Sequence, residues 1–164
     1  MGRLLLPLLL LTAALPLGAR TVEGIELPEF VESRQGSRLA LHGAGIRSKF
    51  FFDIYVGALY LPSTGQSAER IRSEEQPGRI ELHFLYDEVA REKLADAWRS
   101  GFRENNPEEV LDEVTTRLER FVDLFPAAQE GDRFVIEYAP GEGTRVSVNG
   151  EVRGSVEGGV FFRS

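Results

Sequence analysis

Hydrophobic and polar positions predict several strands in the first half of the chain. Residues 22–32 favour a first strand that Pro28 interrupts, and residues 38–42 favour a second that runs into a Gly-Ala-Gly turn at 43–45. Residues 50–61 are apolar at both alternating positions, which is typical of a strand buried on both faces. We therefore expect this segment to lie centrally in a covered sheet.

Apolar residues at helical spacing predict two neighbouring helices in the middle of the chain. Asp87 is a suitable N-cap for the first helix, and Asn106-Pro107 followed by two acids marks the start of the second. The apolar stripes consist of Ala90, Leu94, Ala97, Trp98 and Gly101 in the first helix, and of Val110, Val114, Leu118, Phe121, Val122 and Phe125 in the second. Both stripes would pack on a sheet.

Further strands are predicted on either side of these helices. Residues 79–86 alternate between apolar and polar side chains, and residues 132–139 can pair with 143–149 across a Pro-Gly-Glu-Gly turn. An Asn-Gly turn then leads into residues 151–156. Strands, two adjacent helices and further strands predict an α+β fold, with a largely antiparallel sheet and helices on one face.

The first nineteen residues predict a secretory signal peptide. A short positive start precedes an apolar run from residue 4 to 17, and Gly18-Ala19 supplies small residues for cleavage. A membrane anchor is the alternative, but the run is shorter than the roughly 20 residues of a spanning helix and contains two prolines. We expect a single mature domain, residues 20–164, in the periplasm or secreted.

Composition excludes several kinds of function. The chain has a net charge of −7, and loss of residues 1–19 removes only Arg3 and leaves −8, which disfavours nucleic acid and anionic membrane surfaces. No cysteine is present, so disulfides, thiolate catalysis and cysteine zinc sites are excluded, and two histidines are too few for a His-rich metal site. We expect no metal, no cofactor and no stable membrane insertion of the mature chain.

Arg47 is the candidate functional residue, because a guanidinium beside a run of aromatic and aliphatic residues is costly unless an anion meets it. If one strand continues without a bulge from Arg47 to Tyr55, then Phe51 and Asp53 share a face with both. In one interpretation Arg47 pairs with Asp53 and Tyr55 is core. In the other, Arg47 and the Tyr55 hydroxyl hold a carboxylate at the mouth of an apolar cavity.

Residues 41–61 resemble the signature of the chalcone isomerase-like family, and in particular its bacterial secreted branch. The resemblance lies in Gly-Ala-Gly-Ile-Arg at 43–47 and in the Lys-Phe-Phe and Tyr-Val-Gly-Ala-Leu-Tyr-Leu segments that follow. It continues at residues 93–102 and 138–150. It implies an open-faced β-sandwich, in which a helical layer covers a large antiparallel sheet and a ligand cleft lies between them.

The resemblance implies two functions. Plant members cyclise chalcones with an arginine that stabilises the phenolate, whereas non-catalytic members bind fatty acids with the same arginine and a tyrosine. Arg47 matches the arginine, and Tyr55 stands where the enzymes carry a threonine, as in the fatty-acid binders. The enzymes' helper positions fall at about Ala90, Ala97 and Gly158, so the catalytic set is reduced to one residue.

These observations predict a non-catalytic protein that binds a small amphipathic anion, such as a fatty acid, between sheet and helices. The predicted ligand-binding residues are Arg47 and Tyr55 at the head group and Phe51, Phe52, Ile54 and Trp98 along the walls. One alternative is an isomerase, an intramolecular lyase of a phenolic conjugated ketone, with Arg47 as its catalytic residue. Another is an envelope interaction module without ligand. Similar members continue beyond the Gly-Gly-x-Phe region into a further helix that helps to wall the cleft. The alternatives for this sequence are closure of the pocket by a partner subunit and a chain that is incomplete at this point.

Overall fold

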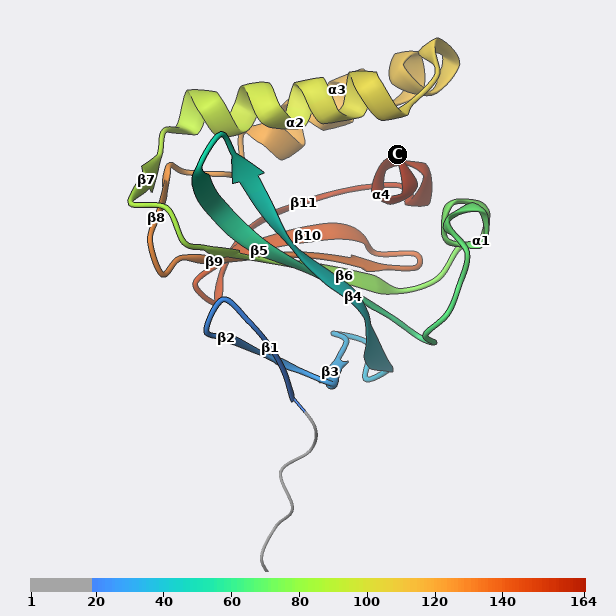
Figure 1. The fold of residues 1–164 in the computed structure, drawn as a ribbon. Coiled ribbons are helices and arrows are strands. Elements are labelled where there is room, and N and C mark those ends of the chain that lie inside the picture. Colours follow the sequence, from blue (N-terminus) through green and yellow to red (C-terminus); the bar gives the residue numbers. More distant parts are fainter. Residues whose placement is uncertain (1–18) are drawn as a thin grey trace, which may run out of the picture.

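A seven-stranded antiparallel sheet forms the centre of the computed structural model, which describes residues 19–164 (Figure 1). The strand order is β11-β10-β9-β6-β5-β4-β3. These strands are β3 (Phe30–Glu32), β4 (Arg38–Lys49), β5 (Phe52–Leu61), β6 (Gly78–Phe84), β9 (Arg133–Ala139), β10 (Gly143–Val148) and β11 (Glu151–Val156). The predicted α+β class and large antiparallel sheet are confirmed. Residues 1–18 of the predicted signal peptide lie outside the described residues.

Two long helices, α2 (Arg91–Asn105) and α3 (Glu108–Val122), cover one face of the sheet (Figure 1). The shorter elements are α1 (Ala68–Ser73), α4 (Gly159–Arg163), the β1–β2 hairpin (Ala19–Val22 and Ile25–Pro28) and the β7–β8 pair (Glu88–Val89 and Ala128–Gln129). Figure 1 shows the β1–β2 hairpin on the side of the sheet away from α2 and α3. Every helix within residues 19–164 is too short or too polar to cross a bilayer.

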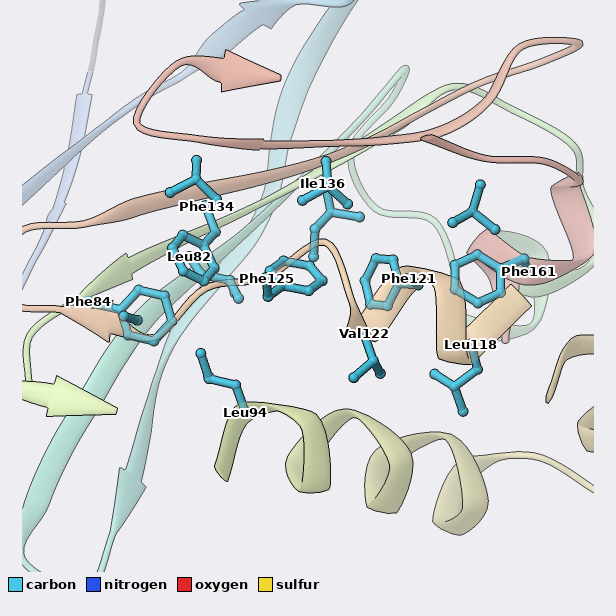
Figure 2. Close-up of a cluster of buried hydrophobic side chains, with 14 of the residues drawn as sticks. Leu82, Phe84, Leu94, Leu118, Phe121, Val122, Phe125, Phe134, Ile136 and Phe161 are labelled. Carbon is cyan, nitrogen blue, oxygen red and sulfur yellow. The ribbon is translucent and has the colours of Figure 1, made fainter. Parts of the chain in front are cut away.

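The main hydrophobic core lies between the sheet and the helices. The alternation in β6 turns Leu82 and Phe84 toward this core, as predicted, and α3 buries its apolar stripe against them. Figure 2 shows Phe84, Phe134 and Phe125 close together in this layer. Burial of such side chains stabilises the domain by about 1.5 to 3 kcal/mol each.

A second core lies on the opposite face, where the β1–β2 hairpin packs on β5. Val56, Ala58 and Tyr60 point to this side and contact Leu27 and Leu39, which have no exposed surface. On the helix-facing side of β5, Tyr55 packs against the main core, whereas Gly57 and Leu59 are only partly buried. The predicted burial of this strand on both faces is therefore confirmed only in part.

Two local predictions are wrong. Gly43 and Gly45 lie inside β4 and pair with Leu59 and Gly57 of β5, because cross-strand hydrogen bonding holds the chain extended where a turn was expected. The stretch after Asp87 forms β7, and α2 begins only at Arg91 with no side-chain cap. The short helix α4 near the end of the chain was not predicted.

The sheet face away from the helices carries a buried ion-pair network around Glu81, whose side chain is 1 % exposed. Arg133 donates to both carboxylate oxygens at 2.6 and 3.1 Å, and His83 Nε2 lies 3.2 Å from one of them. Burial acts to raise the pKa of Glu81, but hydrogen bonds from His83 and Arg133 and the charges of Arg133 and Arg79 outweigh it, so the pKa lies below its ordinary value. Glu81 is therefore a charged, satisfied part of the sheet.

We predict that Glu81→Gln lowers the free energy of unfolding at pH 7 by about 2 kcal/mol, because two charge-assisted hydrogen bonds are weakened. A lowered pKa in the folded state contributes stability above the unfolded value near 4.5, and this contribution is lost as the pH falls through the folded pKa. Urea unfolding at pH 7 and pH 3 should show the gap between wild type and variant closing in acid. The exposed Glu151→Gln is the control, and an equal loss there would contradict the assignment.

Candidate functional site

The β4–β5 hairpin places Arg47 directly opposite Tyr55. The expected continuous strand from one to the other is wrong, because β4 ends at Lys49 and the chain turns back at Phe50 and Phe51. Directly opposed residues of an antiparallel pair project from the same face with Cβ atoms about 5 Å apart. The two predicted head-group residues are therefore neighbours across a hairpin.

Tyr55 defines the face on which this pair lies. Its ring packs edge-on against Phe84 of the main core at 5.6 Å, so Tyr55 and Arg47 are on the helix-facing side of the sheet. Burial raises the pKa of Tyr55 and the charge of Arg47 opposes this rise, so the phenol is protonated at neutral pH. Arg47 is exposed. The pair offers a guanidinium fork beside a neutral hydroxyl donor, a set that suits a carboxylate.

The alternative interpretation, in which Arg47 pairs with Asp53, is wrong. Asp53 Oδ1 instead accepts a hydrogen bond from Ser48 Oγ at 2.6 Å. Among residues 19–164, Arg47 forms no ion pair. Its charge is thus available for an anion from outside the chain.

An open glycine-lined strip continues from the Arg47–Tyr55 pair along the same face. Gly45 lies two residues before Arg47, Gly57 two residues after Tyr55, and Gly43 further along β4. A Cβ atom added at Gly43 or Gly45 would meet nothing within 4 Å, and one at Gly57 would come no closer than 3.6 Å to the Tyr55 ring. From Arg47 to Gly43 the strip is about 13 Å long. An extended apolar chain can therefore approach the backbone along this strip without meeting side chains of Gly43 or Gly45.

Sequence reasoning missed these glycines because Gly-Ala-Gly is typical of a turn. The alternate spacing of these glycines was the signal in the sequence that could have identified the strip. Positions 43, 45 and 47 alternate on one strand, and positions 55 and 57 do so on its partner. Glycine in the interior of a strand often marks a close approach of a ligand or another backbone.

The predicted wall residues on the hairpin do not enclose a cavity. Phe51 is 97 % exposed and Phe52 is 55 % exposed, because both lie at or beside the turn. Ile54 is half-buried on β5, where the register shifts at the Arg47/Ser48 step opposite it. A pocket wall requires side chains directed at a shared space, and the exposure of Phe51 excludes that role in this conformation.

Trp98 is separated from the Arg47–Tyr55 pair by the aromatic core. Tyr55, Phe84, Phe134, Phe125 and Trp98 form a chain of neighbouring rings, with successive centroid distances of 5.6, 4.7, 5.5 and 5.3 Å. Figure 2 shows the middle three of these rings between the strands and α2. The layer between sheet and helices is filled with side chains here, so Trp98 is a core residue and the open surface is the glycine strip.

Two hollows lie elsewhere on the molecule, and Arg47 and Tyr55 line neither. One, of about 390 Å³, lies on the sheet face away from the helices and is lined by four arginines, among them Arg34 and Arg145. The other, of about 360 Å³, lies beside Tyr138, which donates a hydrogen bond to Glu75 Oε1 at 2.5 Å. Within residues 19–164, no three or more His, Asp or Glu side chains are grouped to hold a metal ion.

Comparison with known proteins decides the family. The model of the chalcone isomerase-like family matches residues 19–164. The chain belongs to the chalcone isomerase-like family. No curated protein sequence matches it. Among solved structures, a fatty-acid binding protein from Arabidopsis thaliana superposes with a TM-score of 0.64 at 17 % identity, over 89 % of this chain and 85 % of that one. This likeness shows that the two proteins share a fold.

In this chalcone isomerase-like protein, polar side chains are missing at the three positions that correspond, by resemblance, to the polar residues that assist the arginine in the enzymes. Ala90 is the exposed residue just before α2, Ala97 is exposed on that helix, and Gly158 lines the hollow beside Tyr138. Arg47 therefore has Tyr55 as its one polar neighbour among the residues considered for catalysis. Addition of a phenolate needs both positioning and electrostatic stabilisation, and this arrangement provides little of the former.

We predict that Gly45→Ala leaves the free energy of unfolding unchanged or raises it by up to about 1 kcal/mol, because the added methyl group enters open space and glycine weakens a strand. Gly143→Ala should instead be strongly destabilising. Its φ is +79° and the new Cβ would collide with the carbonyl oxygen of Val156. Thermal unfolding of both variants tests the strip, and a large loss in Gly45→Ala would show that the strip is not open.

Proposed function

We propose that this protein is a non-catalytic binder of a small amphipathic anion, and that a medium-chain fatty acid is the best-fitting ligand. The observation that carries the proposal is the Arg47–Tyr55 pair at the end of an open glycine strip. The guanidinium is without an ion-pair partner in the described part of the chain, and the phenol beside it is a protonated donor.

The contacts available suit each part of such a ligand. Arg47 offers a bidentate fork to the carboxylate and Tyr55 adds one further hydrogen bond. The hydrocarbon chain would lie over Gly45, Gly57 and Gly43, with Leu59 at the far end. Burial contributes about 0.8 kcal/mol per methylene group, so affinity should rise with chain length until the strip of about 13 Å is covered.

Two further observations support this proposal over catalysis. The Arabidopsis protein with the same fold is named for fatty-acid binding, and Tyr55 stands at the position where resemblance implies a tyrosine in binders and a threonine in enzymes. Alanine and glycine occupy the remaining helper positions. The proposed site differs from the sequence prediction in one respect, because it lies on the open side of β4 and β5 and not among the aromatic rings below α2.

We predict that titration with dodecanoate gives saturable binding to the wild type. Arg47→Ala should weaken the Kd by about 10- to 100-fold, because a hydrogen bond to a charged group contributes about 1.5 to 3 kcal/mol. Tyr55→Phe keeps the ring packing and should weaken it by about 3- to 10-fold. Gly45→Val should block the strip while the protein stays folded.

Arg120→Ala, which removes an exposed arginine of α3, is the matched control. The proposal fails if the wild type shows no saturable binding, or if the Arg47 and Arg120 variants bind alike. Cyclisation of a chalcone well above its spontaneous rate, lost in Arg47→Ala, would replace binding by isomerase activity.

The proposal includes export of the chain, as expected for the bacterial secreted branch of the family. Its support is the leader-like sequence, with an apolar run that ends in Gly18-Ala19. N-terminal sequencing of protein recovered from the periplasm or medium of its host should begin near Arg20. A mature protein that still begins at Met1, or that is retained in the membrane, would contradict this part of the proposal.

A further inference from the structure

The turn between β4 and β5 exposes three consecutive phenylalanines. Phe50, Phe51 and Phe52 are 86, 97 and 55 % exposed. With 150 to 250 Å² for each aromatic side chain, they present on the order of 500 Å² of apolar surface at one tip. Apolar surface of this size equals the largest patch of a typical monomeric protein, and such patches are often functional.

The backbone at this tip is strained as well as exposed. Phe50 has a φ of +57°, a left-handed conformation that glycine or asparagine adopts readily and that a bulky residue adopts rarely. A phenylalanine here costs stability in two ways, through strain and through exposed apolar surface. Strain of this kind is typically kept where the side chain has a function.

Positive charge lies immediately behind the aromatic tip. Lys49 and Arg47 precede the turn and Asp53 follows it, so residues 47–53 carry a net charge of +1 in a chain whose net charge is −7. Asp53 is engaged by the Ser48 hydroxyl, and the Phe52 ring rests against Tyr86 at 5.4 Å, which anchors the base of the tip. The hairpin thus has an apolar tip with positively charged side chains behind it. This order matches a membrane interface, where anionic headgroups lie outside the acyl region.

We propose that this hairpin tip, Phe50–Phe52 with Lys49 and Arg47 behind it, docks the protein reversibly onto a lipid bilayer. The phenylalanines enter the boundary between headgroups and acyl chains, and the two basic side chains lie at the level of the phosphates. The acidic remainder of the chain opposes broad adsorption, but at 0.15 M salt charges more than about 8 Å from the surface are largely screened. The charges near the tip therefore dominate its interaction with the bilayer surface.

A bilayer fits this surface better than a protein partner does. A stable protein interface needs about 800 Å² on each side, with a rim of polar contacts around it, and the three phenylalanines of the tip offer less apolar surface than this. Figure 1 shows the hairpin rising from the sheet toward the level of the helical layer. Binding to a bilayer requires only that the aromatic side chains insert to sufficient depth, and it does not require a complementary surface on a partner. Docking also brings Arg47 and Tyr55 to the membrane, so that a ligand enters from the lipid phase; this last step rests on the proposed function, whereas docking does not.

Vesicle co-sedimentation of the full chain tests the proposal, with phosphatidylcholine vesicles containing 20 mol% phosphatidylglycerol at 0.15 M salt. We expect wild-type binding to fall at least tenfold in Phe50→Asn/Phe51→Ser. Asparagine tolerates the left-handed backbone, so this variant should melt at or above the wild-type temperature. Lys49→Ala should reduce binding about fivefold. Val152→Ser, which removes an apolar side chain that is 55 % exposed on β11 and distant from the tip in sequence, should bind as the wild type does.

Dodecanoate titration in solution separates the two proposals, because the tip variant should keep its fatty-acid affinity. Absence of vesicle binding by the wild type overturns the docking proposal even where dodecanoate binds normally. Equal losses in the tip and Val152 variants also overturn it. Light scattering that shows a wild-type dimer dissociated by the tip substitutions would assign the surface to a second copy of this chain.

Discussion

Pairing between β4 and β5 is the interaction on which both the candidate site and the docking tip depend. Its register sets Arg47 against Tyr55, turns the glycines at 43, 45 and 57 toward one face, and brings the chain to a two-residue turn at Phe50 and Phe51. A shift of this pairing by one residue would move each of these side chains to the other face of the sheet. The two cores hold the register, because β5 buries Val56, Ala58 and Tyr60 against the β1–β2 hairpin while its other face meets the main core.

Local periodicity was enough to predict most of the framework. The alternation in β6 and the stripe on α3 reflect burial on one face, which depends on near neighbours in sequence. The Gly-Ala-Gly segment and the stretch after Asp87 were mispredicted, because their conformations are decided by partners distant in sequence. Local propensity does not contain information about partners that are distant in sequence.

The sequence identified part of the candidate site, but the expected geometry of that part was incorrect. Arg47 and Tyr55 were expected to share one strand, and they meet because they face each other across a hairpin. Phe51 and Trp98 were both expected to form walls, but Phe51 lies at the turn and Trp98 lies beyond three aromatic rings from Tyr55. Residue chemistry identified the charged pair, whereas the apolar part of the site depended on a turn position that hydrophobicity alone does not reveal.

The division between the aromatic core and the glycine strip has an evolutionary consequence. Tyr55 contacts both the main core and the surroundings of Arg47, but the glycines of the strip take no part in holding the sheet to α2 and α3, and added atoms at Gly43 or Gly45 meet open space. Mutations along the strip can therefore change the size and shape of what the protein accepts at little cost to folding. Such a scaffold can diversify its ligands within one family while its framework drifts slowly.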